Sequence, residues 1–200
     1  MIILDCEQNS DEWYQARLGI PTASCFEKIV KINGTQSASR EKYLFKLAGE
    51  KLSGEKTDSY YGASMAKGHE REDESRKRYS FINDVEVQQV GFCFFDDKKE
   101  FGGSPDGLVG DDGGFETKNA ESHVQVERLE KGWSKAKHFQ QVQGNLYITD
   151  REWWDLVSYS RGIKPIVIRF TRDEKFITKL ADEIQAFIVD LNNLVTKLKA

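Results

Sequence analysis

The segment that most constrains the fold is the turn Gly110-Asp111-Asp112-Gly113-Gly114. Runs rich in β-branched and aromatic residues flank it, at about residues 101–109 before it and 115–119 after it. Two such runs joined by a short Gly/Asp turn predict an antiparallel β-hairpin. A hairpin centred on Asp111 also predicts the register, because residues at equal distances from the turn then oppose each other.

Helical patterns precede and follow this hairpin. Expected helices are residues 9–18 (with Asn9 and Glu12 as a capping box and Gly19 at the end), 22–30 (capped around Thr22-Ala23-Ser24), 39–52, 65–81, 133–147 and 173–199. Expected strands are residues 85–95, 101–109, 115–119, 153–160 and 165–170, with loops at 31–38 and 53–61. Helices on both sides of a central mixed sheet predict an α/β fold.

Length and composition favour one domain over residues 1–200. The chain is 38% hydrophobic and 31% charged, with no repeat or linker and no apolar run long enough to span a membrane. The N-terminus has no signal-peptide pattern. Cys6, Cys25 and Cys93 form no CxxC pair, so we expect reduced structural thiols in a cytoplasmic protein rather than a zinc site.

The net charge of −4 is unusual for a protein that coats DNA, because such proteins carry a basic surface. That argument applies to the whole surface and leaves open a local site, since acidic metal ligands and an acidic outer surface can coexist with a basic cleft. Charge therefore counts only mildly against a nucleic-acid substrate.

The chemistry is concentrated in Ser104-Pro105-Asp106-Gly107-Leu108 and in Phe115-Glu116-Thr117-Lys118. If the turn is centred on Asp111, then Asp106 and Glu116 oppose each other with β-carbons roughly 5 Å apart. Two opposed carboxylates repel, and a divalent cation between them removes the conflict. Lys118 shares the strand face of Glu116, since the two are two residues apart.

Oxygen ligands and a small number of carboxylates favour Mg²⁺, with Mn²⁺ as a substitute, because magnesium keeps waters and takes phosphate oxygens from a substrate. Such an ion activates a water and neutralises charge on a phosphoryl group. The alternative is an exposed hairpin with ordinary surface charges, because Pro-Asp-Gly is a common turn string.

Further motifs follow one another in a characteristic order. They are Glu12-Trp13, Ala16-Arg17-Leu18-Gly19, Thr22-Ala23-Ser24, Gly68 with Glu72 and Arg76, the two hairpin motifs, and Gln141-Val142-Gln143 with Tyr147. In this ordered set the sequence resembles lambda exonuclease and the YqaJ-like viral recombinases, within the PD-(D/E)xK nucleases. The resemblance runs from about Trp13 to Asp150 and implies a restriction-endonuclease-like fold.

The resemblance also implies roles for individual residues. Asp106 and Glu116 would bind the metal, joined by the backbone carbonyl of Thr117, and Lys118 would be the catalytic lysine. Glu72 would reach a second metal or its waters, and Gln141 would orient Lys118 or a water. Arg17 and Ser24 would contact a terminal 5′-phosphate.

The residues themselves leave alternatives open for these assignments. Glu72 shares a helical stripe with Met65, His69, Arg76 and Tyr79, so it faces inward and needs a partner or a metal. A structural pair with Arg76 at i+4 would also satisfy it.

Polar residues elsewhere are equally open to a structural explanation. Gln141, like Gln140 and Gln143, could simply be a polar residue on the surface. Arg17 and Ser24 could simply cap their helices. None of the histidines His69, His123 and His138 has metal-ligand spacing. Trp133, with Lys131, Lys135 and Lys137, forms a basic-aromatic patch suited to DNA backbone or to solvent.

The resemblance implies a magnesium-dependent exodeoxyribonuclease that degrades one strand of duplex DNA from its ends, 5′ to 3′. It would release mononucleotides and leave 3′ single strands for recombination. A homotrimeric ring and a single-strand annealing partner are implied by the same analogy. The amphipathic helix at 173–199 hints at an oligomer, because its apolar face exceeds what one small sheet needs.

Two other functions remain in competition. The first is a sequence- or structure-specific endonuclease on the same fold, against which the end-binding motifs of Arg17 and Ser24 argue. The second is a DNA-binding module with a degenerate site, against which intact Asp106, Glu116 and Lys118 argue.

Overall fold

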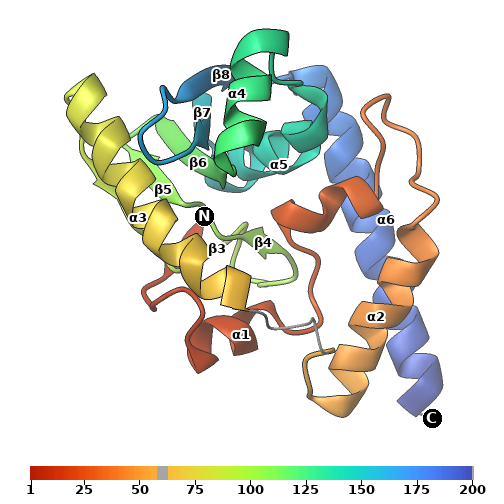
Figure 1. Ribbon diagram of the computed structural model, residues 1–200. Coiled ribbons are helices and arrows are strands. Elements are labelled where there is room, and N and C mark those ends of the chain that lie inside the picture. The colour runs from red at the N-terminus through yellow and green to blue at the C-terminus, as the bar shows by residue number, and fades with distance from the viewer. Residues whose placement is uncertain (58–62, 200) are drawn as a thin grey trace.

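The computed structural model describes residues 1–57 and 63–199, without the side chains of residues 63–70 (Figure 1). The helices are α1 (Asp11–Arg17), η1 (Ala23–Lys28), α2 (Arg40–Ser53), α3 (Ala63–Asn83), α4 (Ser122–Lys131), η2 (Ala136–His138), α5 (Phe139–Thr149) and α6 (Glu174–Lys199), where η marks a 3-10 helix. The strands are β1 (Ile2–Leu4), β2 (Val87–Gln88), β3 (Phe92–Phe94), β4 (Gly102–Gly103), β5 (Gly107–Val109), β6 (Gly113–Asn119), β7 (Trp153–Tyr159) and β8 (Ile166–Thr171).

These strands form two sheets. The larger has the order β2-β5-β6-β7-β8, in which β6 and β7 are parallel and the other neighbours antiparallel. The smaller is antiparallel, with the order β1-β3-β4. Parallel neighbours need a crossover, and α4, η2 and α5 supply it between β6 and β7. The predicted α/β fold with a mixed sheet flanked by helices is confirmed.

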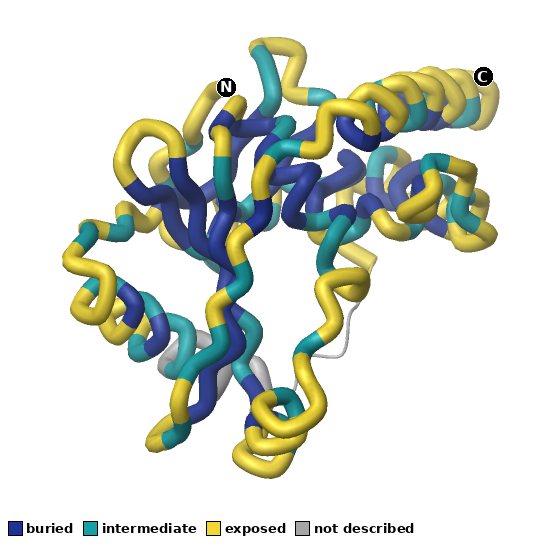
Figure 2. Tube along the Cα trace, turned by 90° about the horizontal axis from the view of Figure 1, so that it is seen from above, coloured by how far each residue is buried: buried dark blue, intermediate teal, exposed yellow. Residues whose placement is uncertain are grey.

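Helices cover both faces of the larger sheet. Tyr79 of α3 packs against Phe115 and Val157 on one face. Trp154 and Leu156 point to the other face and join the core shared with α5. Residues therefore alternate between the two sides of β6, which places Thr117 on the α3 side and Glu116 on the α5 side. Figure 2 shows the buried strands between the more exposed outer surfaces.

The long C-terminal helix α6 lies beside α2, as Figure 1 shows, and most of its apolar face is covered within this chain, with Leu198 exposed near its end. Phe187 stacks on Tyr43 of α2 at 5.6 Å between ring centroids. Leu180, Ile184 and Leu191 are buried in the same core. The expected helix is confirmed, and because most of its apolar face is buried in this chain, that face by itself does not indicate an oligomer.

The N-terminal helices differ in detail from expectation. Ser10, not Asn9, caps α1, because its hydroxyl accepts a hydrogen bond from the Trp13 N–H at 3.2 Å. Asn9 instead has a positive φ of 71°. The second helix is the six-residue 3-10 helix η1, and its N-cap Thr22 makes no side-chain capping bond. The helices expected at 39–52 and 65–81 are present as α2 and α3.

The central strands are shorter than expected. The run at 85–95 divides into β2 and β3, which belong to different sheets, and 101–109 divides into β4 and β5. Residues 120–132 carry no expected element, yet α4 forms there with Gln125 buried and Val126 exposed, which reverses the usual amphipathic pattern. The helix expected from Trp133 starts only at η2. Part of the loop expected at 53–61 lies outside the described residues.

Within the described part of the chain, no helix combines the length and apolar character needed to cross a membrane.

Candidate active site

The hairpin between β5 and β6 sets the geometry of the site. Gly107 pairs with Phe115 and Val109 with Gly113, so the turn is centred on Asp111 as expected. One step beyond this ladder, Asp106 and Glu116 stand opposite each other. An Asp106 carboxylate oxygen, Oδ2, accepts a hydrogen bond from the backbone N–H of Thr117 at 2.7 Å. The predicted register is confirmed.

Two glycines of β6 admit tryptophan rings from the neighbouring strand. A Cβ on Gly113 would lie 2.1 Å from the Trp153 ring, and one on Gly114 would lie 2.1 Å from the Trp154 ring. The absence of side chains at these positions lets β7 pair closely with β6. That pairing holds the strand that carries Glu116 and Lys118.

Glu116 is surrounded by hydrogen-bond donors although only 3% of it is exposed. Its Oε1 accepts from Lys118 Nζ at 2.7 Å and from Gln141 Nε2 at 2.7 Å. Its Oε2 accepts from Asn145 Nδ2 at 3.4 Å. Without such partners a buried carboxylate would destabilise the fold.

The electrostatics distinguish the two acids from the lysine. Burial raises the pKa of Asp106, and the nearby charge of Glu116 raises it further, against the attraction of Lys118. Burial lowers the pKa of Lys118, but Glu116, Asp106 and Glu72 outweigh that effect, so the net shift is upward. The lysine therefore stays protonated, whereas the acids repel each other.

A divalent cation fits this donor set. Two facing carboxylates with a raised pKa on one of them form a site whose repulsion a cation would relieve. In the described part of the chain, no three His, Cys, Asp or Glu side chains are arranged to hold a metal. A site with few carboxylates is the kind that Mg²⁺ uses when water and phosphate complete its ligands.

Glu72 reaches this site from α3. It contributes to the electrostatic environment of both Asp106 and Lys118. Arg76, the alternative partner, donates its Nε to the backbone carbonyl of Asp106 at 3.1 Å and lies 3.3 Å from Asp73 Oδ1. The inward orientation of Glu72 agrees with the sequence pattern, whose members Met65 and His69 have side chains outside the described residues.

One cavity of about 190 Å³ gathers most of the expected site. Its walls include six of the predicted residues, which are Arg17, Ser24, Glu72, Asp106, Glu116 and Gln141. They come from distant parts of the chain, and Lys118 is joined to them through its ion pair with Glu116. The positions that the sequence singled out are thus brought together around one hollow.

Arg17 is held firmly at the edge of this cavity. Its Nη1 donates to Ser104 Oγ at 2.8 Å, and its guanidinium lies 4.0 Å from the centroid of a Trp13 ring. Trp13 Nε1 donates to the same Ser104 Oγ at 2.9 Å. Burial lowers the pKa of Arg17, which at its ordinary value is far above neutrality. Ser104 is a site residue that sequence reasoning missed, although it lies two positions before Asp106.

Ser24 lies in η1 rather than at the start of an α-helix. Its hydroxyl is 3.3 Å from Thr22 Oγ1, and the residue is exposed at the cavity. A six-residue 3-10 helix offers fewer aligned backbone N–H groups than an α-helix, so an anion bound here would be held mainly by side chains. Hydroxyl groups and Arg17 remain to bind an anion.

The comparisons with known proteins bear on this geometry. The sequence profile of the YqaJ-like viral recombinase domain matches residues 12–152. The chain belongs to the YqaJ-like viral recombinase family. Among curated proteins, none gives a significant match.

Solved structures agree with membership of the YqaJ-like family. The alkaline exonuclease LHK-Exo from Laribacter hongkongensis superposes with a TM-score of 0.84 at 32% identity, over 95% of this chain and 96% of that one. LHK-Exo in complex with dAMP gives a TM-score of 0.83 at 33% identity over the same shares of the two chains. A phage-related exonuclease from Haemophilus somnus 129PT shares the fold, with a TM-score of 0.68 at 16% identity over 90% and 96% of the two chains.

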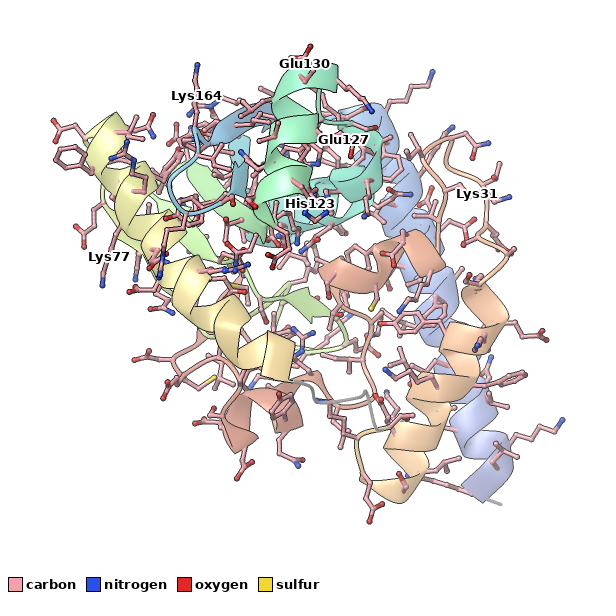
Figure 3. The ribbon with its side chains drawn as sticks, viewed as in Figure 1. Lys31, Lys77, His123, Glu127, Glu130 and Lys164 are labelled. Carbon is pink, nitrogen blue, oxygen red and sulfur yellow. The ribbon has the colours of Figure 1, made fainter. Side chains whose placement is uncertain are left out.

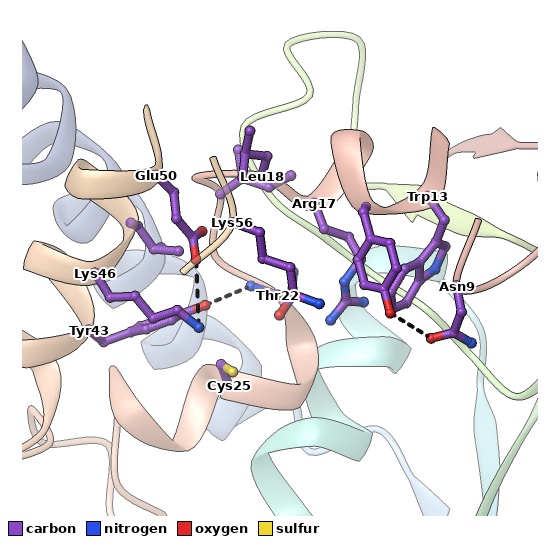
Figure 4. Close-up of a pocket in the computed structure, with 13 residues that line it drawn as sticks. Asn9, Trp13, Arg17, Leu18, Thr22, Cys25, Tyr43, Lys46, Glu50 and Lys56 are labelled. Atoms are coloured by element: carbon purple, nitrogen blue, oxygen red, sulfur yellow. Dashed lines mark hydrogen bonds and ion pairs between the residues drawn. The ribbon is translucent and has the colours of Figure 1, made fainter. Parts of the chain in front are cut away.

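A second cavity of about 230 Å³ adjoins the first in this YqaJ-like domain, and Figure 4 shows it. Trp13 and Arg17 line both cavities. On the far side, Lys46 lies 3.6 Å from Glu50 Oε1, and the Tyr43 hydroxyl accepts from the Thr22 N–H at 3.4 Å. Arg17 therefore stands in a wall between two hollows rather than on open surface.

The basic-aromatic patch around Trp133 is less suited to stacking bases. Trp133 is half-buried, packs against the core, and has the Arg128 guanidinium 4.8 Å from its ring centroid. Lys135 and Lys137 are exposed, and Lys131 pairs with Glu127 at 3.0 Å. Figure 3 shows Glu127 and Glu130 at the outer side of α4, and Lys77 on the outer side of α3. Backbone contacts by these lysines stay a prediction.

Proposed function

We propose that this protein is a magnesium-dependent exodeoxyribonuclease that degrades one strand of linear double-stranded DNA 5′ to 3′. It would release mononucleotides and leave 3′ single strands for recombination. The observation that carries the proposal is that one cavity is lined both by the cation Arg17 and by the acidic pair Asp106 and Glu116. Membership of a family whose solved relatives are exonucleases supports it.

Asp106 and Glu116 would hold the magnesium ion, with Mn²⁺ as a substitute. The backbone carbonyl of Thr117 would add a ligand, and Glu72 would serve a second ion or its waters. When bound, the ion would activate a water and neutralise charge on the phosphate. Burial raises the pKa of Asp106 and the charge of Glu116 raises it further, and a cation between the two acids would relieve that repulsion.

The chain's own groups would position the reacting phosphate. Lys118 Nζ, kept protonated by its 2.7 Å contact with Glu116, supplies a positive charge beside the scissile bond. Gln141 Nε2 fixes the same carboxylate oxygen from α5. Both contacts hold Glu116 in one orientation before substrate arrives, which is the preorganisation that catalysis requires.

Arg17 and Ser24, with Ser104 beside them, would bind the terminal 5′-phosphate. A terminal phosphate carries nearly two negative charges, against one for an internal phosphodiester, so such a pocket prefers a phosphorylated end. A guanidinium can hold two phosphate oxygens at once. The relative crystallised with dAMP supports a mononucleotide as the product.

A homotrimeric ring around double-stranded DNA and a single-strand annealing protein as partner belong to the same proposal. They rest on the family alone, because most of the apolar face of α6 is covered within this chain. Light scattering at micromolar concentration should give about three times 22.9 kDa. A monomeric mass would remove the ring from the proposal.

The alternative function is a sequence- or structure-specific endonuclease on the same fold. The position of Arg17 at the cavity favours end recognition over internal cutting. A linear duplex labelled in turn at each 5′ and 3′ terminus, with and without Mg²⁺, separates the possibilities. Early release of 5′-labelled mononucleotide supports the proposal, and long labelled fragments with fixed ends support the endonuclease.

A further inference from the structure

Asn145 is a polar residue of the cavity that none of the assigned roles uses. It lies on α5 four residues after Gln141, so both amides project from the same face of the helix. Gln141 donates to Glu116 Oε1 at 2.7 Å, and Asn145 donates to Glu116 Oε2 at 3.4 Å. One helix face therefore supplies a donor to each oxygen of the same carboxylate.

The carbonyl oxygen of the Asn145 side chain lowers the stability of the fold. Asn145 is only 1% exposed, and within the described part of the chain its Oδ1 has no hydrogen-bond partner. The atom is packed against Gly103, where an added Cβ would lie 2.7 Å from it. An unpaired buried acceptor destabilises a protein, so packing alone does not explain why an amide stands here.

Gln143 on the same helix shows what a structural amide looks like. It is also 1% exposed, but both ends of its amide are paired. Its Nε2 donates to the Thr171 carbonyl at 2.9 Å, and its Oε1 accepts from the Asp173 N–H at 2.9 Å. Gln143 joins α5 to the end of β8 and does not line the catalytic cavity.

We propose that Asn145 is a positioning residue that fixes the carboxylate plane of Glu116 for metal binding. The inference rests on the proposed function, because it assigns Asn145 to the metal site of that nuclease. With Gln141 and Lys118 on Oε1, Asn145 is the donor that holds Oε2 and so stops the carboxylate from rotating. Groups that orient a metal ligand in this way strongly affect metal affinity.

The test compares Asn145→Leu with Gln143→Leu and the wild type. Mn²⁺ binding is measured by calorimetry without DNA, and Tm is measured without metal. Asn145→Leu should weaken Mn²⁺ binding by about 10- to 100-fold. Its Tm should change little, because leucine has similar volume and the loss of the unpaired acceptor offsets the loss of the donor to Glu116 Oε2. Gln143→Leu should lower Tm and leave the Mn²⁺ affinity unchanged.

Asn145→Ala, measured alongside, removes the same donor without placing new apolar volume against Gly103. It should lose Mn²⁺ affinity to a similar extent, and the Mg²⁺ concentration for half-maximal cleavage should rise in both Asn145 variants. Wild-type Mn²⁺ affinity in both variants overturns the inference and leaves the proposed function intact. A wild type that neither binds Mn²⁺ nor cleaves DNA overturns both.

Discussion

The carboxylate of Asp106 and the backbone N–H of Thr117 are joined by a 2.7 Å hydrogen bond across the hairpin. The bond ties the first acid of the site to the strand that carries the second, Glu116. Because the donor is backbone, the register of the hairpin sets the position of the acid. An asparagine at 106 retains an oxygen that can accept this bond, so its effect on chemistry can be separated from its effect on structure.

Asp106→Asn should reduce cleavage by more than about a hundredfold, because it removes a charged ligand from the proposed metal site. The same change should raise Tm at neutral pH without metal. The raised pKa of Asp106 means that folding disfavours its charged form, and this cost is felt as pH rises through the folded pKa. Nuclease assays and thermal unfolding measure both effects.

Asp111→Asn, in the exposed turn of the same hairpin, is the matched control. It should cleave DNA like the wild type. Equal activity of Asp106→Asn and Asp111→Asn would remove Asp106 from the site.

Glu72→Gln should lose more than about tenfold in rate with little change in Tm, since the group lines the cavity rather than the core. Glu74→Gln is the control. Glu74 also lies on α3, but it pairs with Arg161 and does not line the cavity. Steady-state cleavage rates at saturating Mg²⁺ give the comparison. Nearly unchanged rates in both variants would instead favour a site in which the hairpin acids Asp106 and Glu116 alone hold one metal ion.

Arg17 should determine the preference for a phosphorylated end. The wild type should degrade 5′-phosphorylated duplex faster than 5′-hydroxyl duplex, and Arg17→Ala should slow the phosphorylated substrate most. Arg17→Lys should restore the preference only in part, because lysine lacks the bidentate fork. The measurement is the cleavage rate on the two substrates, with Arg78→Ala, at an exposed position of α3, as the control. If Arg17→Ala slows both substrates equally, Arg17 is structural.

His138 should make the fold sensitive to mild acid. Burial lowers its pKa to about 4, helped by the charges of Lys118, Lys137 and Arg128. An unfolded histidine titrates near pH 6.5, so between about pH 6.5 and 4 the unfolded chain binds a proton that the folded chain refuses. Stability is therefore lost as pH falls through that window.

His138→Gln should show a smaller fall in Tm than the wild type between about pH 6.5 and pH 4, the window set by the two pKa values. The control is His123→Gln, at an exposed position of α4 that is labelled in Figure 3, and its Tm should fall like that of the wild type. If Tm falls with pH by the same amount in all three proteins, the carboxylates alone control the stability in acid.

The sequence predicted what depends on local periodicity and turn chemistry. The turn at Asp111 gave the register that opposes Asp106 and Glu116, and the three- and four-residue spacing gave α6. Tertiary context decided the rest. Gln125 is buried because its amide bonds the carbonyls of Ser158 and Lys164, which no local pattern reveals, and α4 was missed for that reason.

The site was predicted unevenly for the same reason. Asp106, Glu116 and Lys118 lie close in sequence, so a hairpin alone brings them together. Arg17 and Gln141 were selected by resemblance, and only the fold shows that they border the same cavity. Ser104 stands in the motif before Asp106 but its role was missed, and Asn145 carries no spacing signal, because each acts through a partner distant in sequence, Arg17 and Glu116 respectively.

The most direct test of the account mixes linear and covalently closed circular duplex of the same sequence in one reaction. Wild-type protein and a Glu116→Gln variant are compared with Mg²⁺ and with a chelator. The account predicts that the wild type with Mg²⁺ converts the linear form to mononucleotides and leaves the circle intact, while the other three conditions leave both forms intact. Cleavage of the circle, or digestion of the linear form by Glu116→Gln, would contradict it.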